Sequence, residues 1–109
     1  MIKIAVDAMG GDNAPGEIVK GAVDAVTERN DITVCLTGQK DAIEKELSKF
    51  TYKKEQIEIV DAPEVIETGE PPVNAIRKKK NSSLVVGLNL VKNGEADGFV
   101  SAGSSGAVL

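Results

Sequence analysis

The sequence predicts an α/β protein of three layers, in which helices cover both faces of a mainly parallel sheet. Two observations support this class. Short runs rich in Val, Ile and Leu alternate with longer segments whose apolar residues recur at helical spacing. The connections between them are short, and parallel strands need crossover connections such as helices. Aromatic residues are only 3% of the 109 residues, so aliphatic side chains must form the core.

Four strands are predicted along the chain. Each is a short run of apolar, often β-branched residues, bounded by Gly or polar residues. The runs cover residues 2–6, 32–37, 57–60 and 96–100. The first is expected to be a buried strand.

Helices are predicted between these strands. They cover residues 15–29, 41–50, a stretch from about 73 to 80, and a stretch that ends before Gly94. Pro15 fits the first turn of the first helix, where its missing N–H group costs nothing. Ser82 or Ser83 can cap the last helix. A polar loop, 62–72, precedes the third helix.

Two Gly-containing loops are expected at one edge of the sheet. One begins at Asp7 after the first strand, and the other begins at Ser101 after the last strand. Right-handed crossovers place both at the carboxyl edge of a parallel sheet. Ligands of open α/β sheets bind at that edge.

The loop from Ser101 to Gly106 is suited to an anion. Gly103 and Gly106 allow a tight turn with accessible N–H groups, and Ser101, Ser104 and Ser105 add hydroxyl donors. A strand, such a loop and a helix N-terminus together can hold a phosphate. An ordinary strand-to-helix turn with a serine cap is the alternative.

The loop after Asp7 contains Gly10, Gly11 and Asp12. It lacks the spacing of a dinucleotide fingerprint, and Glu17 stands where a phosphate-binding P-loop needs lysine. Two aspartates beside two glycines suit a substrate-positioning or metal-assisting role. Alternatively, both aspartates hydrogen-bond to backbone amides within a turn.

A basic run interrupts this chain, whose formal net charge is −4. It consists of Arg77, Lys78, Lys79 and Lys80. The run can be a docking patch for an anionic partner, or a solvated helix end where cations complement the helix dipole. Asn81 and Ser82 follow it and can add hydrogen bonds to a phosphate.

Composition argues against several classes. The net negative charge disfavours a nucleic-acid partner. A single cysteine, Cys35, and the absence of His disfavour zinc and exclude a Ser-His-Asp triad within this sequence. No apolar run reaches the roughly 20 residues of a membrane span. With no secretory leader, a cytoplasmic location is expected.

The chain stops at Leu109, three residues into a predicted helix. We therefore expect residues 1–109 to be the N-terminal part of a single, longer α/β enzyme, with other site residues beyond Leu109.

Three blocks of the sequence resemble a known family. Residues 4–15, with Asp7-Ala8-Met9-Gly10-Gly11-Asp12, are similar to the opening of the bacterial phosphate acyltransferases of phospholipid synthesis. Residues 75–83 and 101–107 resemble two further blocks of that family, in the same order. One departure is Ser104-Ser105, where the family usually has Asn-Thr.

The resemblance implies a fold like that of phosphate acetyltransferase and isocitrate dehydrogenase, and a homodimer. It implies transfer of a fatty acyl group from acyl carrier protein to inorganic phosphate, without a cofactor or metal. Asp7, Asp12, Ser101, Ser104 and Ser105 would then serve catalysis.

In the same interpretation, phosphate or substrate would be bound by Gly10, Gly11, Asn81, Ser82, Gly103 and Gly106. The basic run would dock the acidic carrier, and regions outside this sequence could contact the inner face of the membrane. The alternative is a non-catalytic phosphate- or nucleotide-binding α/β module. A related dehydrogenase would need a nicotinamide fingerprint, which we do not find.

Overall fold

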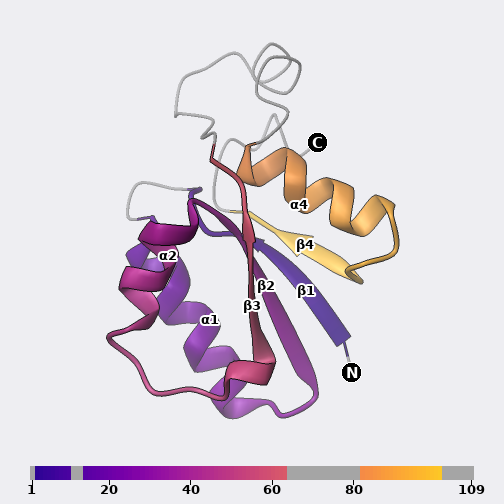
Figure 1. The fold of residues 1–109 in the computed structure, drawn as a ribbon. Coiled ribbons are helices and arrows are strands. Elements are labelled where there is room, and N and C mark those ends of the chain that lie inside the picture. Colours follow the sequence, from indigo (N-terminus) through magenta and orange to yellow (C-terminus); the bar gives the residue numbers. More distant parts are fainter. Residues whose placement is uncertain (1, 11–13, 64–81, 102–109) are drawn as a thin grey trace.

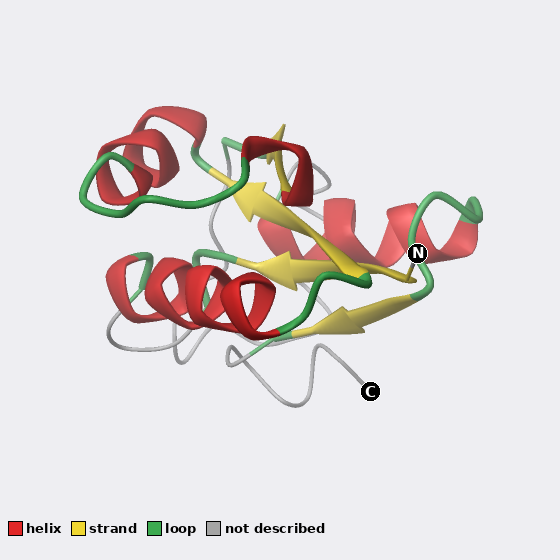
Figure 2. Ribbon diagram, turned by 90° about the horizontal axis from the view of Figure 1, so that it is seen from below, coloured by secondary structure: helices red, strands yellow, loops and turns green. Residues whose placement is uncertain are grey.

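The structure is a computed structural model, and it describes residues 2–10, 14–63 and 82–101. The described strands form one parallel sheet in the order β3-β2-β1-β4 (Figures 1 and 2). They are β1 (Ile2–Asp7), β2 (Ile32–Gly38), β3 (Ile57–Asp61) and β4 (Gly98–Val100). The parallel α/β class predicted from the sequence is confirmed.

Helices cover both faces of this sheet (Figure 1). The helices α1 (Gly16–Glu28) and α2 (Lys40–Leu47) pack on one face, and α4 (Ser83–Lys92) packs on the other. A short 3₁₀ helix, η1 (Lys54–Gln56), precedes β3 and was not expected from the sequence. The three-layer arrangement is therefore present in the described part of the chain.

The larger core lies between the sheet and the helices α1 and α2. The helix α1 buries side chains at helical spacing, namely Val19, Ala22, Val23 and Val26. They pack with Leu36, Ile43 and Leu47. Pro15 is the N-cap of α1, one residue before the predicted place in the first turn, and its carbonyl accepts a hydrogen bond from Val19 N at 2.9 Å.

A smaller core lies on the α4 face. There Ala5 of β1, Cys35 of β2 and Ala96 are buried, with Phe99 and residues of α4 against them. Side chains two apart on a strand share a face. The residues that follow on this same face are therefore Asp7 on β1, 37 on β2 and 101 after β4, and these are all polar.

Three expectations need correction. The helix α2 ends at Leu47 instead of Phe50, because Phe50 N bonds the carbonyl of Leu47 in a tighter turn. The ladder of β4 begins at Gly98 instead of Ala96, because Ala96 N donates to the carbonyl of Leu90 in α4. The strand β1 is not buried throughout, since Ile2 is 48% exposed.

The described residues leave the α1 face of the sheet incompletely covered next to β4. An apolar groove of about 340 Å³ runs there between α1 and the strands β1, β2 and β4. Ile4, Ile18, Ala25 and Val100 line it, and Val100 is 57% exposed. The groove accounts for the partial burial of Ile4 and Val6 in β1.

The expected loop 62–72 and the expected helix near 73–80 lie, apart from Ala62 and Pro63, outside the described residues. Within the described ranges, no helix has the length and apolar character needed to cross a membrane.

Candidate functional site at the carboxyl edge of the sheet

Asp7 and Ser101 meet at the carboxyl edge of the sheet. The hydroxyl of Ser101 donates a hydrogen bond to Asp7 Oδ2 at 2.9 Å. The two residues are 94 positions apart in the sequence and come together because β1 and β4 are neighbours. The expectation that the two loops begin at one edge is confirmed for Asp7 and Ser101, while residues 102–106 lie outside the described part of the chain.

Asp7 is nearly buried, with 4% of its surface exposed. Its second carboxylate oxygen, Oδ1, accepts a hydrogen bond from Met9 N at 3.0 Å. The aspartate thus shapes the turn after β1, as the structural alternative expected, and also orients a serine hydroxyl. A carboxylate fixed by donors on both oxygens is held in one geometry.

The strand order reverses at this pair. The chain proceeds from β1 outward to β2 and β3, and then returns across the sheet to place β4 on the other side of β1. In open α/β sheets, the crevice at such a reversal is the usual ligand site. Asp7 and Ser101 end the two strands that flank the reversal, which makes their edge the candidate active site.

The N-terminus of α4 lies at the same edge. Ser82 is its N-cap, and its hydroxyl accepts a hydrogen bond from Val85 N at 3.2 Å, which confirms the predicted capping. Ser82 and Ser83 are both buried. The structure thus shows a structural task for Ser82; the predicted contact of Ser82 with phosphate stays a prediction.

Thr37 belongs to this edge and was not singled out from the sequence. It is fully buried at the end of β2, opposite Asp7 in the ladder. Its hydroxyl donates to the carbonyl of Ser83 at 2.8 Å. The sequence does contain a signal for it: Thr37 is a polar residue two positions after Cys35, so both side chains are expected on the same face of the strand.

Most other predicted site residues lie outside the described ranges. Gly10 is described and is buried in the turn after β1. The others are Gly11, Asp12, Arg77, Lys78, Lys79, Lys80, Asn81, Gly103, Ser104, Ser105 and Gly106. Their roles stay predictions.

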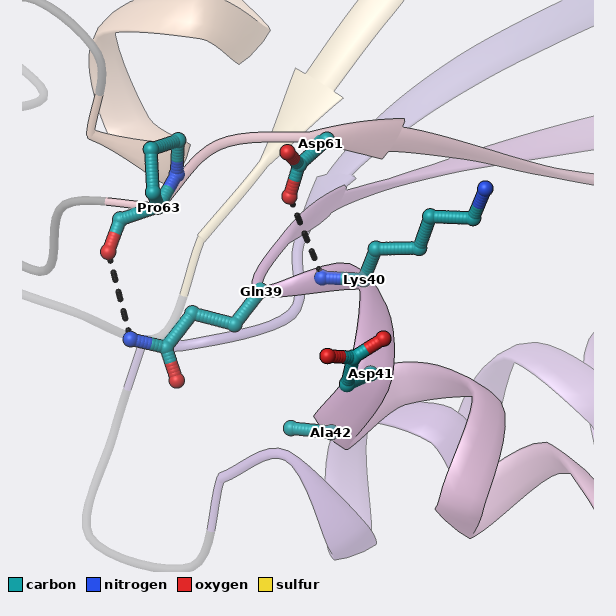
Figure 3. Close-up of a pocket in the computed structure, with 6 residues that line it drawn as sticks. All are labelled: Gln39, Lys40, Asp41, Ala42, Asp61 and Pro63. Carbon is teal, nitrogen blue, oxygen red and sulfur yellow. Dashed lines mark hydrogen bonds between the residues drawn. The ribbon is translucent and has the colours of Figure 1, made fainter.

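A hollow lies beside the N-terminus of α2 (Figure 3). It has a volume of about 580 Å³ and lies beside Gln39, Lys40, Asp41 and Asp61. Asp61 Oδ1 accepts a hydrogen bond from Lys40 N at 3.3 Å. A carboxylate therefore already accepts a hydrogen bond from this helix end.

Cys35 does not supply a nucleophile. It is buried under α4, and its thiol donates to Glu58 Oε2 at 3.3 Å. Burial, followed by the hydrogen bond and negative charge of Glu58, raises the pKa of this thiol to about 11. A thiol that stays protonated at neutral pH is unreactive.

Comparison with known proteins finds a matching family and named relatives. A family model described as "Fatty acid synthesis protein" matches residues 2–109. The chain is 55% identical over 108 residues to a phosphate acyltransferase of Clostridium botulinum, covering 99% of this chain and 32% of that protein.

Two further relatives carry the same name. A phosphate acyltransferase of Clostridium acetobutylicum is 54% identical over 106 residues, which are 97% of this chain and 32% of that protein. One of Clostridioides difficile is 51% identical over 108 residues, 99% of this chain and 32% of that protein. The chain therefore spans about a third of the length of these relatives.

Proposed function

Because this chain belongs to the family described as fatty acid synthesis proteins, we propose that it is part of a phosphate acyltransferase. The proposed reaction transfers a fatty acyl group from acyl carrier protein to inorganic phosphate and gives an acyl phosphate. The names of the relatives support the acyltransferase class. The carrier as donor and the acyl phosphate as product are the finer part of the proposal.

The observation that carries the proposal is the Asp7–Ser101 pair at the reversal of strand order. An oxygen of phosphate attacks the thioester carbonyl carbon, the C–S bond breaks, and the carrier thiol leaves with a proton. This chemistry requires no enzyme nucleophile. It requires that phosphate be oriented and that the developing oxyanion be stabilised.

We assign Asp7 and Ser101 to the orientation of phosphate. The Ser101 hydroxyl, held by the Asp7 carboxylate, is a fixed polar group at the place where the strand ends open toward a ligand. The loop that continues from Ser101 to Gly106 would supply N–H donors for phosphate and the oxyanion. Gly10, Gly11, Asn81 and Ser82 complete the proposed phosphate site, and Asp12 is proposed to serve catalysis with Asp7.

The proposal extends to partners and location. The positive charges of the basic run Arg77–Lys80 would attract the negatively charged acyl carrier protein and dock it. A homodimer, a cytoplasmic location and a peripheral contact with the membrane are further parts of the proposal.

The test uses the full-length protein that contains this sequence. Acyl carrier protein loaded with a fatty acid is incubated with enzyme, and the free carrier thiol is measured with phosphate, with sulfate and without either anion. We expect release of the thiol with phosphate only. A folded protein that binds phosphate and releases no thiol would support the binding module instead.

A further inference from the structure

We infer that Thr37 is a positioning residue for the Asp7–Ser101 pair, an inference that rests on the proposed function. Thr37 is opposite Asp7 in the parallel ladder of β1 and β2. It is fully buried, so its hydroxyl acts on protein groups and does not touch substrate.

Thr37 contacts the backbone on both sides of Asp7. Its carbonyl accepts a hydrogen bond from Ala8 N at 2.9 Å. Its hydroxyl lies 3.3 Å from the carbonyl of Val6, in hydrogen-bonding geometry. The residue therefore fixes the path of the chain just before and just after the Asp7 carboxylate.

The same hydroxyl anchors the first turn of α4. Its shorter hydrogen bond, at 2.8 Å, goes to the carbonyl of Ser83, the first residue of that helix. This contact spans 46 positions of sequence. One buried side chain thus connects β1, β2 and α4 at the edge where Ser101 meets Asp7.

A geometric role follows from burial. In a closely packed interior, a lost hydrogen bond is not replaced by water, and the neighbouring carbonyls must shift to find a donor. Both carbonyls that Thr37 contacts belong to segments at the Asp7 edge. We therefore expect its loss to misplace the Asp7–Ser101 pair, with an effect on turnover larger than the effect on carrier binding.

The experiment compares Thr37→Val and Thr37→Ser in the full-length protein. Valine keeps the size of the side chain without the hydroxyl, and serine keeps the hydroxyl without the methyl group. We expect Thr37→Val to lower kcat about tenfold, which corresponds to about 1.4 kcal/mol, with the KM for the carrier unchanged. Thr37→Ser keeps the hydrogen bond and should therefore retain a kcat within about twofold of wild type.

Thr33→Val is the matched control. Thr33 is also buried, on the same strand and the same face as Thr37, but toward the amino end of the sheet. The Thr33→Val variant should leave kcat unchanged, whatever its effect on thermal stability. A similar fall of kcat in both valine variants would overturn the inference.

Coupling gives an independent readout. If Thr37 acts through the Asp7–Ser101 pair, Thr37→Val should lower kcat much less in a Ser101→Ala background than in wild type.

A wild-type kcat in folded Thr37→Val overturns the inference and leaves the proposed function intact. Wild-type enzyme without phosphate-dependent thiol release overturns the proposed function itself. If Thr37→Val does not fold, Thr37→Ala replaces it, and failure of both to fold assigns Thr37 to stability alone.

Discussion

Asp7 combines a structural and a proposed chemical task, and a pair of substitutions separates them. Asp7→Asn keeps an oxygen for Met9 N and an amide group beside the Ser101 hydroxyl, but it removes the charge. We expect kcat of the full-length enzyme to fall by about 10²-fold, the cost of misplacing a group that orients a reactant, with stability nearly unchanged. Steady-state kinetics and thermal unfolding measure both quantities.

Asp7→Ala should behave differently from Asp7→Asn. It leaves the Met9 N–H and the Ser101 hydroxyl without their acceptor in a nearly buried place, which costs about 1–3 kcal/mol of stability. If Asp7→Asn retains wild-type kcat, the carboxylate only shapes the turn and does not serve the reaction.

Cys35 provides a prediction about pH. Its pKa is raised in the folded state from the ordinary value of 9.0 to about 11. The unfolded chain therefore loses this proton first, so the thiol's contribution to stability is fully present below about pH 9 and is lost as the pH rises toward about 11.

The matched variant for this pH dependence is Cys35→Ala, which removes the titrating thiol from its buried place on the α4 face. Chemical unfolding at pH 8 and pH 10.5 should show a smaller loss of stability for Cys35→Ala than for wild type. The wild-type thiol should also resist alkylation at pH 7 until the protein unfolds. Rapid alkylation of the folded protein would contradict this prediction.

At the scale of elements, the close contact between α4 and β4 can be tested at Gly87. A Cβ atom at this position would lie 2.7 Å from Cδ1 of Phe99, which is closer than carbon atoms approach. We expect Gly87→Ala to destabilise the protein by about 1–3 kcal/mol through overpacking, although alanine favours helix formation. Denaturant unfolding of the full-length protein measures this change.

Phe99→Leu provides the control for Gly87. The smaller side chain leaves room for the added methyl group, so Gly87→Ala should cost less in the Phe99→Leu background than in wild type. Additive costs would show that α4 does not rest on Phe99 through Gly87.

The elements also show what sequence patterns can and cannot predict. Periodicity and Gly punctuation predicted the strands and the helices α1, α2 and α4, and the serine cap of α4 followed from local chemistry. The start of β4 was missed because Ala96 N donates to the carbonyl of Leu90 in the turn that follows α4, so Ala96 does not join the ladder. Thr37 was missed because its partners are 31 and 46 positions away.

At the scale of the whole molecule, we predict that the basic run docks the carrier. Reversing charge at Lys78 and Lys79 should raise the KM for acyl carrier protein and weaken its salt dependence. The KM for phosphate should not change, because exposed charges act over only about 8–10 Å at physiological salt. An unchanged KM for the carrier would make these lysines part of a solvated surface.

Which strands are neighbours could not be predicted from local patterns. The order β3-β2-β1-β4 places the last described strand beside the first. Nothing in the sequence of residues 96–100 indicates that β1 is the neighbouring strand. The prediction that Asp7 and Ser101 lie at the same edge rested only on the general rule that parallel strands share a carboxyl edge. The rule predicts the edge, and the tertiary packing decides which residues meet on it.

The placement of β4 beside β1 has a consequence for how the protein is made. On the ribosome, β1 emerges first, yet this neighbour emerges about 90 residues later, since β1 pairs with residues 98–100. Closing so long a loop is entropically costly and slows folding. Until then, one edge of β1 lacks the partner it has in the folded chain, and such an edge is prone to pair with other chains. The candidate site therefore forms only after β4 has emerged and docked beside β1.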